Sequence, residues 1–297
     1  MNVLIMNRSQ HAFLRRSISL LALVFVLGGT ATPQDAGDFF DSNGVQIHYI
    51  DIGEGEPVVL LHGINSNLQR AWFDRDIANQ LQVAGYRVLA LDARAHGKSG
   101  TPHDPAQYGP EMALDIERLL DHVGLSKAHV VGYSMGALIA GKLRELRPDR
   151  IVSLTLGGYG WRREAGPSPY HLELADSLER GDGFMPLYRY SYPDWSEEDR
   201  EARSRATLAR LPDIAATIAL LRGYKFSVAE ESLRNNTVPT LAIIGELDPR
   251  KESVDAFQGV MKNLEIVVIE GADHGKAIGR PEFIANVIEF LERHSVD

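Results

Sequence analysis

The chain has 297 residues, of which 44% are hydrophobic and 24% charged, an ordinary composition for a globular protein. Its formal net charge of -9 argues against nucleic acids and anionic membrane surfaces as partners. The absence of cysteine excludes disulfides, thiolate metal sites and a cysteine nucleophile. The length suits one large α/β domain with an insertion, or two small domains.

The first 31 residues have the pattern of a signal peptide. Basic residues precede the apolar run 18–27, and small residues follow it. Gly29-x-Ala31 is one plausible cleavage signal, and Ala36 is a second candidate. The apolar run is too short for a comfortable membrane span. We therefore expect residues 1–31 to be removed and the protein to be exported, either to the periplasm or out of the cell. An uncleaved anchor is the alternative, and the general and twin-arginine export routes both stay open.

Short apolar runs bounded by turn residues predict the strands. Residues 38–53 predict a β-hairpin around the turn Ser42-Asn43-Gly44, whose residues favour positive φ. The expected strands span 38–40, 45–51, 57–61, 86–91, 128–131, 151–156, 239–244 and 265–269. Amphipathic patterns predict helices over 72–81, 107–123, 137–146 and 281–291. Strands that alternate with helices predict an α/β fold, with a mostly parallel sheet covered on both faces.

This alternation breaks between Gly160 and Val238. The segment contains helical stretches at 169–178, 196–208 and 214–221, and many aromatic residues. We therefore expect a core made of residues 38–160 and 238–297, with a helical cap at 161–237 over the carboxyl edge of the sheet. The aromatic residues suit either an apolar acyl or aryl pocket or simple packing. The pair Arg162-Arg163 suits either attraction of a substrate carboxylate or a solvated face.

The pentapeptide Gly132-Tyr133-Ser134-Met135-Gly136 joins a predicted strand to a predicted helix. Glycine at its first and last positions allows the strand and the helix to pass close together, because glycine has no Cβ. Ser134 is then held in a strained conformation at the tip of the turn. This G-x-S-x-G arrangement is typical of a serine nucleophile.

A serine hydroxyl needs a base, most often histidine, and the base needs an acid to orient it. His274 follows the last predicted strand, and Asp248 follows the strand before it. Parallel strands bring both to the same sheet edge as Ser134, in the chain order that belongs to this turn. Glu246 and Asp273 are rival acids.

An oxyanion intermediate needs two backbone amides. The amide of Met135 stands at a helix N-terminus, where amides lack partners. The second donor is expected from the loop after the strand at 57–61, where Gly63 permits a close approach and Ile64 follows it. His62 beside them is either a base or a residue that fixes this loop by hydrogen bonds.

These motifs resemble those of the α/β-hydrolase-fold enzymes, within the lid-bearing serine esterase group. The resemblance covers about residues 38–293. It is carried by His62-Gly63, by Asp92-Ala93-Arg94-Ala95-His96-Gly97-Lys98-Ser99, by the pentapeptide around Ser134, and by Gly245 to Asp248 with His274. The resemblance implies that His96 and Ser99 brace the loops near the nucleophile. Ala95 departs from the family, which often has glycine there.

The resemblance also narrows the activity. Epoxide hydrolases and haloalkane dehalogenases of this family use aspartate as the nucleophile, so Ser134 argues against both. The resemblance implies a hydrolase of small-molecule carboxylic esters that needs no metal or organic cofactor. Its catalytic residues would be Ser134, Asp248 and His274, and its oxyanion hole would be formed by Ile64 and Met135. Hydrolysis of lactones, thioesters or carbon–carbon bonds is the alternative, as is a small-molecule receptor with a near-idle triad.

Overall fold

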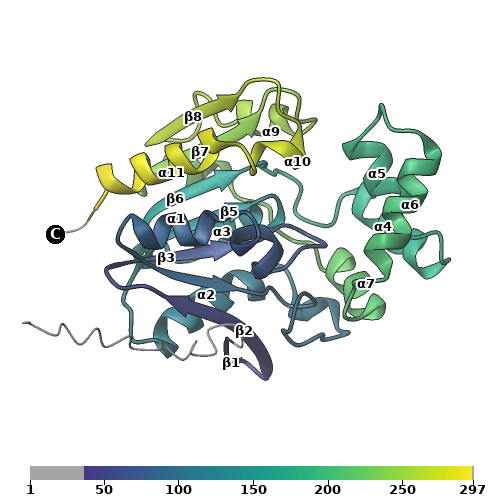
Figure 1. Cartoon of the computed structure of the whole chain (residues 1–297), viewed down its shortest axis with the longest axis horizontal. Coiled ribbons are helices and arrows are strands. Elements are labelled where there is room, and N and C mark those ends of the chain that lie inside the picture. The colour runs from purple at the N-terminus through teal and green to yellow at the C-terminus, as the bar shows by residue number, and fades with distance from the viewer. Residues whose placement is uncertain (1–36, 296–297) are drawn as a thin grey trace, which may run out of the picture. The chain divides into compact units, whose positions relative to one another are not determined.

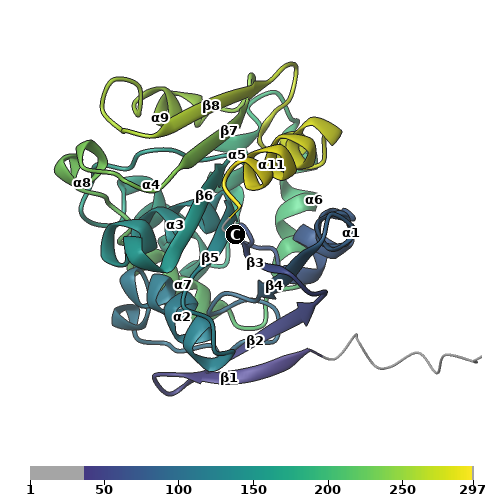
Figure 2. The same ribbon diagram turned by 90° about the vertical axis from the view of Figure 1, so that its left-hand side faces the viewer.

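The computed structural model describes residues 37–295, so the signal peptide expected at residues 1–31 lies outside the described part of the chain. The described residues fall within one compact unit. Its centre is an eight-stranded sheet in the order β1-β2-β4-β3-β5-β6-β7-β8 (Figures 1 and 2). The strands are β1 (Asp38–Ser42), β2 (Val45–Ile52), β3 (Glu56–Leu61), β4 (Tyr86–Leu91), β5 (Ala128–Tyr133), β6 (Ile151–Gly157), β7 (Thr240–Gly245) and β8 (Leu264–Ile269). Only the two pairs that contain β2 are antiparallel within this sheet, which confirms the expected α/β class.

Helices cover both faces of the sheet. Figure 2 shows α2 (Pro110–His122) and α3 (Met135–Leu146) on one face, with α1 (Ile77–Val83) and α11 (Pro281–Arg293) on the other. All six residues of β5 are buried. Val130 and Val131, two consecutive residues of β5, belong to two different hydrophobic cores, because successive side chains of a strand point to opposite faces. Burial on both faces explains why these strands appear in the sequence as continuous apolar runs.

Two expected helices differ from the structure. The single helix expected over 72–81 is instead a π-helical turn, η1 (Gln69–Phe73), followed by α1. Asp76 separates them because its φ of 62° is left-handed and cannot continue a right-handed helix. The helix expected over 107–123 begins at Pro110, after Gly109 with φ 65°. Proline suits the first helical position because its missing N–H would have no partner there.

Between β6 and β7 the described chain forms helices and no strand. They are α4 (Pro169–Glu179), α5 (Met185–Ser191), α6 (Glu197–Leu208), α7 (Ile214–Arg222) and α8 (Glu230–Arg234), and Figure 1 shows α4 to α7 grouped together. The sequence predicted α4, α6 and α7, whereas α5 and α8 are additional. Leu174, Phe184 and Leu221 form part of a small core of their own in this insertion. None of the helices within residues 37–295 has the length and apolar character needed to cross a membrane.

Candidate active site

Three parallel strands, β5, β7 and β8, deliver the three candidate catalytic residues to one edge of the sheet. Ser134 directly follows β5, Asp248 follows β7, and His274 follows β8 as the first residue of the short helix α10 (His274–Ala277). Strands β5 to β8 lie in sequence order and run parallel, so their carboxyl ends meet at the same edge. Ligand sites of open α/β sheets occur at this edge.

The turn at Ser134 has the strained geometry that the sequence predicts. Ser134 has φ 56° and ψ -115°, which is unfavourable for a residue with a side chain. A Cβ added to Gly132 would lie 2.2 Å from the carbonyl oxygen of Gly136, and one added to Gly136 would lie 2.0 Å from that of Leu61. Both positions therefore require glycine, so that α3 can pass over β5 and β3.

The structure brings Ser134, His274 and Asp248 into a hydrogen-bonded chain. His274 Nε2 lies 3.0 Å from Ser134 Oγ, and His274 Nδ1 lies 2.6 Å from Asp248 Oδ2. The Asp248 side chain is fully buried and acts only as an acceptor when ionised. It therefore favours the tautomer with the proton on Nδ1, which leaves Nε2 free to accept the Ser134 hydroxyl proton.

The surroundings of His274 keep its imidazole neutral. Desolvation by burial lowers the pKa of His274, and the nearby positive charge of Arg250 lowers it further, while Asp248 acts in the opposite direction. The hydroxyl of Tyr133 also donates a hydrogen bond of 2.6 Å to the backbone carbonyl of His274. The residue before the serine thus holds the main chain of the histidine in place.

The two rival acids, Glu246 and Asp273, accept hydrogen bonds from backbone amides of nearby loops instead of contacting the His274 ring. The Asp273 carboxylate is the N-cap of α10 and accepts hydrogen bonds from the amides of Gly275 and Lys276. The Glu246 carboxylate accepts a hydrogen bond from the amide of Gly271. The residue that contacts His274 Nδ1 is Asp248.

The expected oxyanion donors lie beside the serine. Met135 is the first residue of α3, and Ile64 lines a cavity together with Ser134. A Cβ added to Gly63 would lie 3.2 Å from the Cβ of Ser134, so the loop before Ile64 approaches the serine closely. Among residues 37–295 the structure records no acceptor for the amide of Ile64 or Met135. Both amides are therefore free to bind a developing oxyanion.

His62, His96 and Ser99 brace the loops around the serine. His62 bonds the carbonyl of Gly63 through Nδ1 and accepts the amide of Ala93 at Nε2. Burial lowers the pKa of His96 to about 3, so this ring stays neutral. Its Nε2 accepts the amide of Asn65.

Ser99 ties the last part of this loop to two other segments. It accepts the amide of His48 and donates to the carbonyl of Asp92. These contacts occupy the polar atoms of all three side chains, so His62 fixes the loop rather than acting as a base.

Sequence reasoning missed Arg250. Its amide donates a 2.9 Å hydrogen bond to Asp248 Oδ1, and its guanidinium Nη1 lies 3.7 Å from the same oxygen. Nη2 donates to Ser191 of α5, and the guanidinium lies over the ring of Tyr190. Its place two residues after Asp248 was the available signal. The partners in α5 are distant in sequence and left no signal.

Ser134 opens onto two cavities. The tyrosine cavity, of about 150 Å³, is lined by Ile64, Tyr159, Tyr170, Tyr190 and Tyr224 among others. The arginine cavity, of about 250 Å³, also contains His274.

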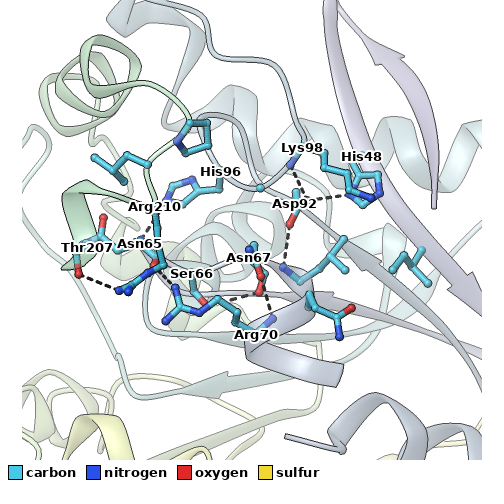
Figure 3. A pocket seen from close by; sticks show the side chains of 16 residues that line it. His48, Asn65, Ser66, Asn67, Arg70, Asp92, His96, Lys98, Thr207 and Arg210 are labelled. Atoms are coloured by element: carbon cyan, nitrogen blue, oxygen red, sulfur yellow. Dashed lines mark hydrogen bonds and ion pairs between the residues drawn. The ribbon is translucent and has the colours of Figure 1, made fainter. Parts of the chain in front are cut away.

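A larger cavity of about 480 Å³ does not contain Ser134 (Figure 3). We call it the adjoining cavity, because it shares Asn65, Arg70 and Arg210 with the arginine cavity. In the described part of the chain, no group of three or more His, Asp or Glu side chains is placed to hold a metal ion.

The neighbouring arginines 162 and 163 differ from each other. Arg162 is buried, and its guanidinium lies over the ring of Tyr224, whereas Arg163 is exposed. The solvated-face interpretation of the pair is therefore wrong for Arg162.

Comparisons with known proteins agree with the observed fold. The profile of the alpha/beta hydrolase fold family matches residues 56–223. The 2-hydroxy-6-oxononadienedioate/2-hydroxy-6-oxononatrienedioate hydrolase 2 of Pseudomonas putida is 32% identical over 269 residues, which cover 84% of this chain and 92% of that protein.

Other relatives share a smaller region. Epoxide hydrolase 3 of Siraitia grosvenorii is 36% identical over 160 residues, or 54% of this chain, and this chain spans about half of it (49%). Among solved structures, an esterase from Exiguobacterium antarcticum has a TM-score of 0.71 at 23% identity, covering 86% of this chain and 99% of that one. At this identity the likeness shows the fold alone.

Proposed function

This chain belongs to the alpha/beta hydrolase fold family, and on that premise we propose that it hydrolyses small-molecule carboxylic esters through an acyl-serine intermediate. The observation that carries the proposal is the chain of two hydrogen bonds from Ser134 Oγ to His274 Nε2 and from His274 Nδ1 to Asp248 Oδ2. Fold membership alone does not fix the reaction, so the proposal rests on these side chains.

In the first half of the reaction, Ser134 Oγ attacks the ester carbonyl carbon and its proton passes to His274 Nε2. Asp248 stabilises the resulting imidazolium through Nδ1–H. The amides of Ile64 and Met135 bind the carbonyl oxygen as it becomes an oxyanion, and each donor contributes about 3 kcal/mol of barrier reduction. The intermediate collapses, the carbon–oxygen bond to the alcohol breaks, and His274 returns the proton to the leaving alcohol.

In the second half, a water molecule takes the place of the alcohol. His274 Nε2 removes a proton from this water, which attacks the acyl-serine carbonyl. The same two amides bind the second oxyanion. Ser134 leaves with the proton from His274, and the carboxylic acid is released. Each of the two attacks uses a neutral His274 as base, which agrees with its lowered pKa, and each collapse uses the imidazolium as acid.

Hydrolysis of a carbon–carbon bond next to a carbonyl is the second candidate. The similarity to the Pseudomonas putida dienedioate hydrolase favours carbon–carbon bond hydrolysis, because the alignment covers 92% of that protein. The epoxide hydrolase relatives carry less weight, because this chain spans only about half of each of the two from Siraitia grosvenorii, and because Ser134 stands where the family resemblance implies an aspartate for that reaction.

The test is hydrolysis of p-nitrophenyl esters of increasing acyl length by the wild type and Ser134→Ala. We expect turnover of at least a short ester by the wild type and none above background by the variant. A fluorophosphonate should label the wild type once, at Ser134, as read by peptide mass spectrometry. Labelling without ester turnover would direct the search to carbon–carbon substrates and lactones. Absence of both would leave the receptor as the surviving hypothesis.

A further inference from the structure

Arginines converge on the cavity that contains the candidate nucleophile and base. Arg70 of η1, Arg75, Arg203 of α6, Arg210 and Arg250 all line the arginine cavity with Ser134 and His274. Neither aspartate nor glutamate lines this cavity within the described chain. The concentration of positive charge is unusual in a protein with a formal net charge of -9.

The arginines at the mouth of this cavity lack carboxylate partners. Within residues 37–295, the structure records no ion pair for Arg70, Arg75, Arg203 or Arg210. By contrast, Arg205, on the same helix as Arg203, pairs with Glu201. Several exposed arginines elsewhere also pair with carboxylates, among them Arg180 with Asp182 and Arg222 with Glu179. Apart from one hydrogen bond from Arg70 to the carbonyl of Asn65 and one from Arg210 to Thr207, these four guanidiniums have no recorded side-chain hydrogen bond within residues 37–295.

Arg70 is held in an electrostatically unfavourable place. Desolvation lowers the pKa of Arg70 most, and the positive charges of Arg210 and Arg203 lower it further, although Asp74 opposes them. Figure 3 shows Arg70 and Arg210 together with Asn65, although the two arginines come from segments distant in sequence. An anion between them would relieve this repulsion, because each guanidinium binds carboxylates with paired N–H groups.

Asn65 supplies an independent observation. Both polar atoms of its carboxamide are buried and have no hydrogen-bond partner in the described structure. Its φ of 60° is rare for a residue with a side chain. Its backbone carbonyl accepts a hydrogen bond from Arg70 Nη1. A buried polar group without a protein partner is completed by a water, an ion or a ligand, and the position of Asn65 beside Arg70 and Arg210 favours an anionic ligand here.

The position of His274 tells which end of the substrate enters the arginine cavity. In the proposed reaction His274 Nε2 must return its proton to the leaving alcohol, so the alcohol lies on the side of His274. Ser134 and Ile64 line both cavities, whereas His274 lines only the arginine cavity of the two. The acyl group therefore occupies the tyrosine cavity, and the leaving group occupies the arginine cavity.

We propose that the leaving-group part of the substrate carries a carboxylate, which is bound in the arginine cavity mainly by Arg70 and Arg210, with Asn65 Nδ2 as a further donor. This inference rests on the proposed function for the side on which the carboxylate lies. The rim arginines 75 and 203 attract the anion and raise its local concentration.

The test compares two esters of similar size and shape, 4-acetoxybenzoate, which carries a negative charge, and 4-acetoxybenzamide, which is neutral. Wild-type protein should hydrolyse the carboxylate with a kcat/KM about tenfold above that of the amide, as charge-assisted hydrogen bonds imply. In Arg70→Gln/Arg210→Gln this ratio should fall to near one. The control Arg180→Gln/Arg205→Gln removes the same charge from exposed arginines that line neither cavity at Ser134, and it should keep the wild-type ratio.

Two results would overturn the inference while leaving the esterase intact. One is a wild type that hydrolyses the amide at least as well as the carboxylate. The other is an equal loss of preference in both double variants, which would mean that only net charge matters. If the double variant does not fold, Arg210→Gln alone serves, because Arg210 is exposed and its guanidinium bonds only Thr207 in the described structure.

A separate measurement applies if the wild type hydrolyses neither ester, an outcome that counts against the proposed function. Calorimetric binding of both compounds to Ser134→Ala then judges the arginine cavity directly. Tighter binding of the carboxylate, lost when Arg70→Gln/Arg210→Gln is added, supports the anion site. Equal binding of the two compounds overturns it.

Discussion

Arg250 contacts Asp248 twice, through its backbone amide at 2.9 Å from Oδ1 and through its guanidinium at 3.7 Å from the same oxygen. The residue therefore holds Asp248, the candidate acid, and also brings a positive charge close to His274, the candidate base. Because Nη2 bonds Ser191, the same side chain ties the acid loop to helix α5 of the insertion.

The positive charge of Arg250 should influence the pH dependence of kcat/KM. Activity requires neutral His274, so kcat/KM rises with pH through the pKa of that imidazole. In the wild type this pKa is lowered, so the rise should be centred below 6.5. Arg250→Met removes a charge that lowers the pKa, and the rise should move to higher pH. Arg250→Lys keeps the charge and should stay close to the wild type. Identical profiles for all three proteins would contradict an influence of Arg250 on His274.

Asp248 and Asp273 should differ sharply when each is changed to asparagine. Asp248→Asn removes the charge that stabilises the imidazolium and favours the wrong tautomer, so kcat should fall about 10³- to 10⁴-fold. Asp273→Asn keeps a good N-cap for α10 and should lose less than about tenfold. Steady-state kinetics with a p-nitrophenyl ester measures both. A larger loss in Asp273→Asn would make that residue the acid.

Two glycines of α3 should respond oppositely to alanine. The Cβ of Gly136→Ala would meet the Leu61 carbonyl oxygen at 2.0 Å, so this variant should lose about 3 kcal/mol of unfolding free energy or fail to fold. Nothing lies within 4 Å of a Cβ at Gly141, so Gly141→Ala should gain about 0.5–1 kcal/mol from higher helix propensity. Urea unfolding of both variants gives the comparison. A stable Gly136→Ala protein would argue against the close passage of α3 over β3.

The buried pair Arg94–Asp115 should dominate the stability of the loop after β4. Both side chains are essentially buried, and Arg94 Nε and Nη2 donate to the two carboxylate oxygens at 2.8 Å and 2.7 Å. Arg94→Met leaves the buried Asp115 carboxylate without its guanidinium partner, so it should lower the free energy of unfolding by about 3–5 kcal/mol.

The double variant Arg94→Met/Asp115→Leu should cost much less than the two single variants together. Burial raises the pKa of Asp115, so the deficit of Arg94→Met should shrink as the pH falls and the carboxyl becomes neutral. Additive losses in urea unfolding would contradict a coupled pair.

The core of this fold could be predicted from sequence because burial on both faces leaves a clear pattern. All eight strands follow apolar or alternating runs between turn residues. Because parallel strands end at one edge, the spatial meeting of Ser134, Asp248 and His274 follows from their places after strands. Gly132 and Gly136 predicted the tight turn around Ser134, because no residue with a Cβ fits at either position.

The remaining features depend on contacts between segments that are distant in sequence. The break at Asp76 lies in a backbone conformation that no apolar pattern records. Helix α5 is seven residues long and contains a proline near its start, so it has no readable period. The Arg250 guanidinium bonds Ser191 of that helix, and the charge of Arg210 lies close to Arg70. Such pairings appear only once the insertion has been folded.

The backbone at Ser134 also has an evolutionary consequence. Its left-handed conformation costs a serine free energy that a glycine would not lose, because glycine adopts positive φ without a Cβ clash. Selection for thermal resistance alone would therefore replace this residue and gain stability. In the proposed reaction Ser134 is the nucleophile, so selection for turnover would retain it, whereas Ser134→Gly would relieve the strain and leave a chain that can bind its substrate without converting it.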